Sequence, residues 1–271
     1  MKDFFGFGGY TREPEGFLSW QHLTFVTSLV IIMVALAILF GRRNRNASQK
    51  AKDVPLIVSA ILINLLEISK AVIACFRCED AMRWLYELPL FLCSIQFFTI
   101  PLAAFTKGRI KEVCLDFVFI FGILGALLGT YGAGNNYSCY PVISLDNVVS
   151  GLSHVTSGFC SLYIAISGMT SMKRKNIPFC FAIVSAFCAI SYAVNIAIDY
   201  NYMFLMRGDG TPYDILYNLV SGNKVAYPLL VILLFFVYIV VFRSIYSFAT
   251  RKKKSEESAD KSEEAKSLIY S

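Results

Sequence analysis

LTFVTSLVIIMVALAILF, residues 23–40, is followed at once by GRRNRNASQKAK, residues 41–52. The first stretch carries no charged side chain, and a helix needs about 20 apolar residues to cross the hydrocarbon core of a bilayer. The second stretch is rich in Arg and Lys, which short cytoplasmic loops retain. Together the two stretches predict a membrane-spanning helix that enters from outside and ends at the cytoplasmic face.

The same alternation of apolar runs and short charged connections continues along the chain. Open sheet edges cannot be hydrogen-bonded in lipid, so spanning segments of this length are expected to be helices. The sequence therefore predicts an all-α polytopic membrane protein with about seven transmembrane helices. The predicted spans are residues 23–40, 54–76, 88–106, 113–131, 148–171, 177–199 and 225–248.

The distribution of Lys and Arg predicts the orientation. The basic clusters fall in alternate connections, whereas the opposite side holds far fewer positive residues. This bias places the N-terminus outside and the C-terminus in the cytoplasm. The clusters occupy residues 42–52, 107–111, 173–175 and 251–254.

Three regions follow from this topology. We expect residues 1–21 to form an extracytoplasmic N-terminal segment, residues 22–248 to form the helical bundle, and residues 249–271 to form a disordered cytoplasmic tail of low hydrophobicity. The long outer loop, residues 200–227, carries too many apolar residues to float in water. It is expected to pack over the mouth of the bundle.

Composition narrows the class of protein and its partners. The chain is 56% hydrophobic and only 16% charged, which indicates a protein dissolved mainly in lipid. Its net charge of +6 comes from short clusters between apolar runs and not from one basic face, so membrane lipids are the expected partners and nucleic acid is not. No cofactor is predicted.

Most of the eight cysteines lie in apolar runs and are expected to behave as small hydrophobic residues. Cys75 and Cys78 form a CxxC motif at the outer end of the second span. Without a second CxxC or a nearby histidine, the motif does not predict a metal site. A redox role and a disulfide between Cys78 and Cys139 stay open as alternatives.

Polar side chains within the membrane are costly, so their depth is informative. At 1.5 Å per residue, Glu67, Cys93 and His154 lie roughly 9–14 Å below the outer ends of their helices. A cluster confined to the outer half of the bilayer predicts a cavity that opens outward. An ion pair of Glu67 with Lys70, and a polar helix-packing stripe around His154, are structural alternatives. Further candidates for this cavity are His22, Lys70, Gln96 and Asn195.

Cys93 is the candidate nucleophile. A thiol in apolar surroundings is inert unless a base or a positive charge favours the thiolate. His154 lies at a similar depth and is the candidate base, with Glu67 or Asn195 to orient its ring.

ELPLFLCSI, residues 87–95, occurs with His22, Glu67, His154 and NYMFLM, residues 201–206. This combination resembles the YwaF-like family of bacterial integral membrane proteins, which is similar to eukaryotic transmembrane acyltransferases of phospholipids. The resemblance implies a bacterial plasma membrane location.

The resemblance also implies particular site residues. It places the catalytic pair at Cys93 and His154, and adds Asn201 and Tyr202 to the residues expected to line or orient the site. Phe91 departs from the family pattern, in which a more polar residue is common, so no role is expected for that position.

Two function classes follow. The leading hypothesis is lipid acyl transfer or ester hydrolysis by Cys93 and His154 in the outer half of the bilayer. The alternative is a small-molecule transporter or binding protein in which Glu67, Lys70, His154 and Asn195 hold a ligand that is not altered. A seven-helix receptor also fits the topology, but topology alone does not imply function.

Overall fold

The computed structural model describes residues 2–170 and 172–269, with side chains for residues 4–170 and 172–250. Within these ranges the chain forms helices and turns and no strand, which confirms the predicted all-α class. The long helices are α2 (Trp20–Asn44), α3 (Gln49–Cys78), α5 (Gly108–Tyr131), α7 (Leu145–Ile166), α8 (Ile177–Ile198) and α10 (Ala226–Ile269). The short ones are α1 (Lys2–Phe5), η1 (Ala81–Tyr86), η2 (Cys93–Ile95), α4 (Gln96–Phe105), α6 (Gly134–Cys139), η3 (Arg174–Asn176), η4 (Tyr202–Phe204) and α9 (Asp214–Leu219).

Six helices of the described chain are long and apolar enough to cross a membrane. Serine residues set the start of three of them, because a serine hydroxyl satisfies a backbone N–H that the first turn leaves unpaired. Ser19 caps α2, Ser48 caps α3 and Ser144 caps α7, each accepting from the N–H three residues later. With six long apolar helices, the protein is a polytopic membrane protein.

The third predicted span, residues 88–106, is wrong as a continuous helix. The helix begins only at Cys93 with the single turn η2 and continues as α4, and its length of about 20 Å is less than the hydrocarbon thickness. Pro89 explains the break, because proline lacks an N–H and disfavours helical geometry at Leu88. Residues 88–92 are irregular and at least half-buried within the bundle, where membrane proteins tolerate such backbone.

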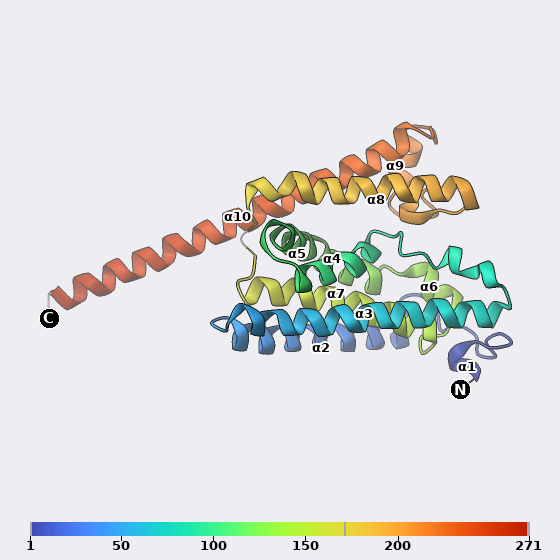
Figure 1. Ribbon diagram of the computed structural model, residues 1–271, viewed down its shortest axis with the longest axis horizontal. Helices are drawn as coiled ribbons and strands as arrows, with labels where there is room; N and C mark the ends of the chain where they lie inside the picture. The colour runs from blue at the N-terminus through green and yellow to red at the C-terminus, as the bar shows by residue number, and fades with distance from the viewer. Residues whose placement is uncertain (1, 171, 270–271) are drawn as a thin grey trace.

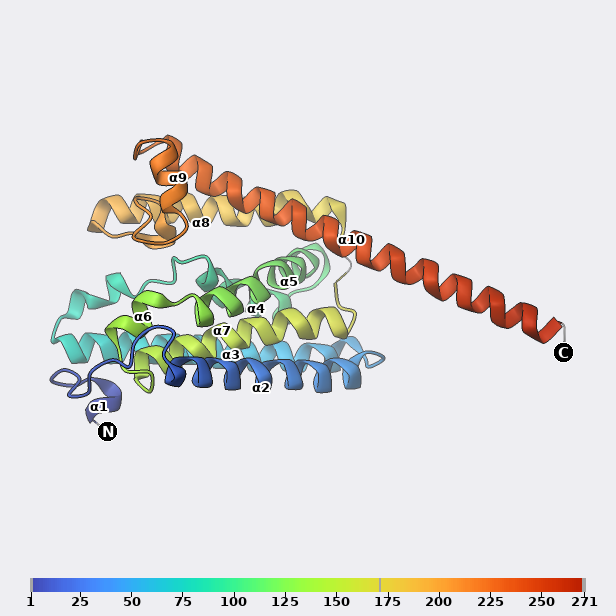
Figure 2. The same ribbon diagram turned by 180° about the vertical axis from the view of Figure 1, so that it is seen from behind.

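Helices α5 and α7 form the centre of the bundle. In their most apolar windows 67% and 61% of residues are buried, against 17–22% for α2, α3, α8 and α10. Figures 1 and 2 show α2 and α3 along one side, α8 and α10 along the other, and α4, α5 and α7 between them. The outer helices expose large apolar side chains such as Ile61, Leu65 and Ile196, as expected of surfaces that face lipid.

Close packing of α5 on α7 depends on small residues. A Cβ added to Gly122 would lie 2.5 Å from the carbonyl oxygen of Ser157 on α7. One turn later, Ser161 donates a hydrogen bond of 2.7 Å to the carbonyl oxygen of Phe119 on α5. Small residues and hydroxyl groups at the contact let two membrane helices approach and hydrogen-bond.

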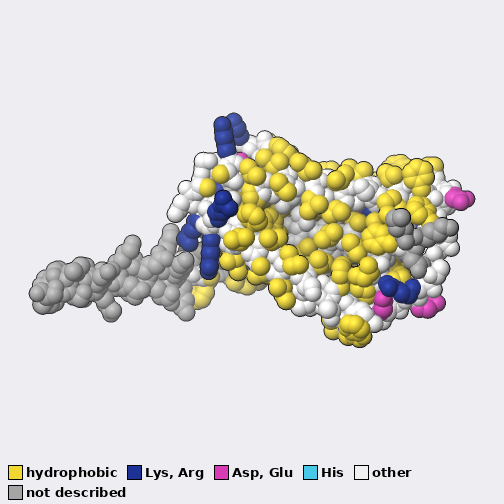
Figure 3. Space-filling view, turned by 90° about the horizontal axis from the view of Figure 1, so that it is seen from below, with side chains coloured by type: hydrophobic (Ala, Val, Ile, Leu, Met, Phe, Trp, Pro, Cys, Tyr) yellow, Lys and Arg dark blue, Asp and Glu magenta, His cyan; other side chains and the backbone are white. Residues whose placement is uncertain are grey.

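The two ends of the bundle differ in charge. On the face shown in Figure 3, Lys and Arg gather at the end from which α10 projects, and the Asp and Glu side chains lie mainly toward the other end. The termini lie at opposite ends (Figure 1). We call the end with the connections 42–52, 107–111 and 173–175 the cationic end; its assignment to the cytoplasm stays a prediction from the positive-inside rule.

The segment that follows α8 packs as the sequence predicts. Tyr202, Met203 and Leu205 are at most 2% exposed, so this loop covers the bundle at the end opposite the cationic end.

Helix α10 continues at its C-terminal end to Ile269, through residues for which the sequence predicts a disordered tail. That segment is rich in Lys, Glu and Ala, which are strong helix formers.

Candidate functional site

Cys93 occupies the first turn of a helix that starts inside the membrane-embedded bundle. Its backbone belongs to η2, which leads directly into α4. Its thiol is partly buried. The N–H of the next residue, Ser94, donates to the Phe91 carbonyl oxygen at 3.0 Å, which joins the start of this helix to the irregular segment before it.

Contacts from the C-terminal half of the chain hold the irregular segment before Cys93. The Tyr202 hydroxyl donates to the Leu85 carbonyl at 2.6 Å and accepts from the Leu88 N–H at 3.1 Å. Ser191 on α8 donates to the Leu90 carbonyl at 3.0 Å. Burial raises the pKa of the Tyr202 hydroxyl, which therefore stays protonated and keeps donating. These contacts replace the hydrogen bonds that a regular helix would supply.

Cys93 and His154 both lie against one face of α5, beside Gly125 and Gly129. A Cβ on Gly125 would lie 3.8 Å from Cβ of Cys93, and a Cβ on Gly129 would overlap the imidazole of His154. The His154 ring also interacts with the backbone of Gly125. Residues four apart lie one above the other on a helix. Cys93 from η2 and His154 from α7 therefore meet α5 at adjoining positions, and both residues are partly exposed.

Glu67 on α3 contacts both the helix that carries His154 and the neighbouring Lys70. Its carboxylate accepts a hydrogen bond of 2.7 Å from Ser153, the residue before His154, and its other oxygen lies 3.3 Å from the Lys70 ammonium. Lys70 also pairs with Glu87 at 3.4 Å, and Glu87 with Arg83 at 3.2 Å. Charges of alternating sign thus run from η1 to the neighbourhood of His154.

Arg83 and Glu87 stabilise each other at the η1 end of this series of charges. Burial opposes the charge of Arg83, but the Glu87 carboxylate prevails and raises the pKa of the guanidinium. Lys70 and Glu67 form the ion pair that the sequence left open as a structural alternative, and the same carboxylate binds the helix that carries His154.

Gln96 lies one helical turn after Cys93 and is 1% exposed. Its carbonyl oxygen accepts from the Thr99 hydroxyl at 3.2 Å, while its amide nitrogen finds no hydrogen-bond partner among the described residues. An unpaired buried donor costs free energy on the order of 1–3 kcal/mol.

His22, Asn195 and Asn201 have partners of their own. The His22 ring packs against Tyr137 in a tilted arrangement with centroids 3.9 Å apart, and one ring nitrogen lies 3.1 Å from the Thr130 carbonyl oxygen. Asn195 binds both backbone groups of Tyr202, at 2.7 and 3.0 Å, and Asn201 binds the backbone of the following loop.

The structure thus brings Cys93, Gln96, Glu67, Lys70 and His154 to one region. It gives the other predicted residues contacts that shape the loops around this region.

The CxxC cysteines do not pair in the structure. Cys75, Cys78 and Cys139 are free thiols, as are the other five cysteines, all of which lie in the described part of the chain. Within that part, no group of three or more His, Cys, Asp or Glu side chains is arranged to hold a metal ion.

Residues 17–246, from just before α2 to the middle of α10, match the TMEM164 family. The chain belongs to this family. The match identifies only the TMEM164 family. The YwaF-like resemblance and the relation to acyltransferases therefore stay predictions. No curated protein and no solved structure matches the chain.

In this TMEM164 family member, the predictions from the sequence did not include the glycines of α5 that lie against Cys93 and His154. Gly122, Gly125 and Gly129 recur at spacings of three and four, which places them on one face of a helix. That spacing was the available signal for close approach on α5. Pro89 in ELPLFLCSI was the signal that the third span is interrupted.

Proposed function

We propose that this TMEM164 family protein transfers or hydrolyses acyl groups of membrane lipids, with Cys93 as nucleophile and His154 as general base. The observation that carries the proposal is the shared face of α5, where Gly125 adjoins Cys93 and Gly129 underlies the His154 ring. The predicted YwaF-like resemblance supports the same pair of residues.

The reaction would proceed through a thioester. His154 takes the Cys93 proton, the thiolate attacks the carbonyl carbon of a lipid ester, and the C–O bond breaks as the imidazolium returns its proton to the departing alcohol. His154 then deprotonates a lipid hydroxyl or a water molecule. The attack of that oxygen on the thioester releases the new ester or the free acid and regenerates the thiol.

One feature of the site supports this chemistry. Cys93 and His154 are both partly exposed residues, which leaves room for a lipid to approach them. With the site in the outer half of a plasma membrane, a phospholipid is a more accessible acyl donor than a cytoplasmic thioester.

Purified protein in liposomes that contain phospholipid with a labelled acyl chain tests the proposal. Transfer or release of label is expected, and both Cys93→Ala and His154→Ala should abolish it. Cys75→Ala is the matched control, because Cys75 is another partly buried free thiol, and it should keep full activity. Equal turnover in wild type, Cys93→Ala and His154→Ala would refute the proposal.

The chain of charges supports a second candidate, a carrier that binds a polar ligand without altering it. Glu67, Lys70 and Glu87 place both signs of charge beside the site. Uptake into proteoliposomes that needs Glu67 but not Cys93 would favour this function over acyl transfer.

A further inference from the structure

A cavity opens at the cationic end, away from Cys93 and His154. Its volume is about 510 Å³, and its walls come from the first turns of α3 and α5, the turn between α4 and α5, and Met169 after α7. Both charged and apolar side chains line the cavity. The apolar ones include Phe105, Leu115 and Met169, and Phe105 is 62% exposed.

The two carboxylates in this cavity are already neutralised. Asp53 pairs with the Lys111 ammonium at 2.7 Å and accepts from the Gln49 amide at 2.8 Å. Glu112 pairs with Lys173 at 2.7 Å. A ligand in the cavity therefore meets little uncompensated negative charge.

Two further lysines line the same cavity without a carboxylate partner among the described side chains. Lys50 and Lys107 line it, are exposed, and make no ion pair with any described side chain. Lys50 belongs to the first turn of α3 and Lys107 to the turn before α5, so two different elements supply them. α5 also starts here without a side-chain cap, which adds partial positive charge from its free N–H groups.

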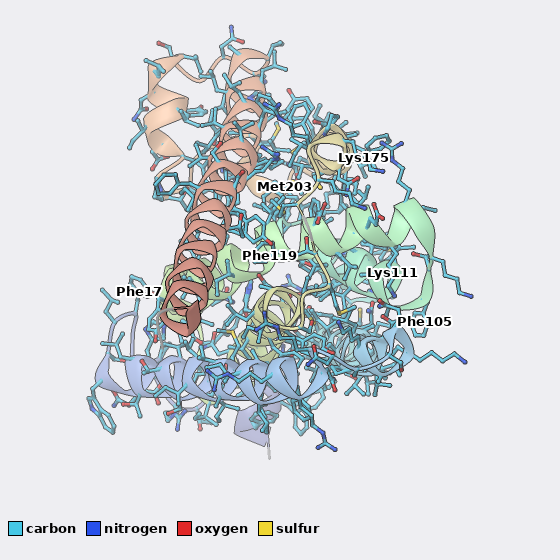
Figure 4. All side chains as sticks on the ribbon, turned by 90° about the vertical axis from the view of Figure 1, so that its left-hand side faces the viewer. Phe17, Phe105, Lys111, Phe119, Lys175 and Met203 are labelled. Carbon is cyan, nitrogen blue, oxygen red and sulfur yellow. The ribbon has the colours of Figure 1, made fainter. Side chains whose placement is uncertain are left out.

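We propose that this cavity binds an anionic phospholipid, with the phosphate between Lys50 and Lys107 and an acyl chain along Phe105. Charge complementarity selects a phosphate, and the exposed Phe105 in the same lining selects a lipid over a soluble phosphate compound. Figure 4 shows Phe105 and Lys111 together at one edge of the bundle, apart from Lys175. The proposal is independent of acyl transfer at Cys93.

The test uses the full-length protein in nonionic detergent and the binding of a fluorescent short-chain phosphatidylglycerol, followed by fluorescence anisotropy. Unlabelled phosphatidylglycerol is expected to compete at least about tenfold better than phosphatidylcholine, and inorganic phosphate is not expected to compete. The double variant Lys50→Ala/Lys107→Ala should lower affinity about tenfold, since each basic residue near an anionic lipid contributes on the order of a fewfold. Lys50→Arg/Lys107→Arg should retain binding.

Arg43→Ala/Lys175→Ala is the matched control. It removes the same charge from the cationic end, and neither residue lines the cavity. Its affinity should stay within about twofold of wild type if the cavity is the site. Equal losses in the two alanine variants would show a diffuse effect of surface charge and overturn the proposal. It would also be overturned by unchanged binding in Lys50→Ala/Lys107→Ala, by equal competition from phosphatidylcholine, or by effective competition from inorganic phosphate.

Discussion

Gly129 lies directly beneath the imidazole of His154, so closely that a Cβ at position 129 would overlap the ring. The absence of a side chain on α5 therefore determines where a histidine on α7 can sit. On the same face, Gly122 makes room for the Ser157 backbone, and Cys93 lies beside Gly125 at an ordinary contact distance.

Gly129→Ala should displace the His154 ring. Overpacking of a well-packed contact costs about 1–3 kcal/mol, and the proposed acyl-transfer activity should fall at the same time. Thermal unfolding and turnover of the purified variant check both effects. Gly134→Ala is the control, because a Cβ there meets Phe17 at an ordinary 3.6 Å. An unchanged unfolding temperature and turnover in Gly129→Ala would contradict this packing.

Tyr202→Phe should loosen the segment that leads to Cys93. The substitution leaves the Leu85 carbonyl and the Leu88 N–H without their partner, at a cost on the order of 1–3 kcal/mol. The rate at which a membrane-permeant maleimide labels Cys93 is expected to rise. If labelling is as slow as in wild type, the Tyr202 hydroxyl does not hold this segment.

Arg77→Ala should strongly destabilise the end of the bundle opposite the cationic end. The guanidinium binds both carboxylate oxygens of Asp146, at 2.6 and 3.0 Å, and both side chains are about nine-tenths buried. Removal of one partner from a buried pair costs about 3–5 kcal/mol. Arg12→Ala breaks an ion pair whose arginine is 52% exposed, so it should cost no more than about 1 kcal/mol. Similar unfolding temperatures for the two variants would contradict the difference in burial.

Stability should fall in alkaline solution through Tyr10. Burial, reinforced by the Asp146 carboxylate to which its hydroxyl donates, raises the pKa of Tyr10 above its ordinary value of about 10. The stabilisation from neutral Tyr10 is fully present below about pH 10, the unfolded-state value, and is lost as the pH rises through the raised pKa of the folded state. The unfolding temperature of wild type should therefore drop more steeply above about pH 10 than that of Tyr10→Phe. Parallel curves would exclude this contribution.

The sequence by itself determined the all-α class and six of the seven spans that it predicted. Hydrophobicity over about 20 residues and serine caps are local properties, and lipid forces such runs to satisfy their backbone hydrogen bonds within the helix. The candidates Cys93 and His154 were also visible, because polar groups at membrane depth are unusual.

Only the tertiary structure decided how the segment before Cys93 is held and which candidates meet. Pro89 signals locally that the third span is interrupted, but the irregular segment is held by Tyr202, more than 100 residues later in the chain. Cys93 and His154 both lie against one face of α5, where the absence of a side chain at Gly129 makes room for the His154 ring. Hydropathy gives the depth of a residue in the membrane, whereas the direction in which it faces depends on how helices rotate and pack against one another, and that is decided by contacts between distant segments.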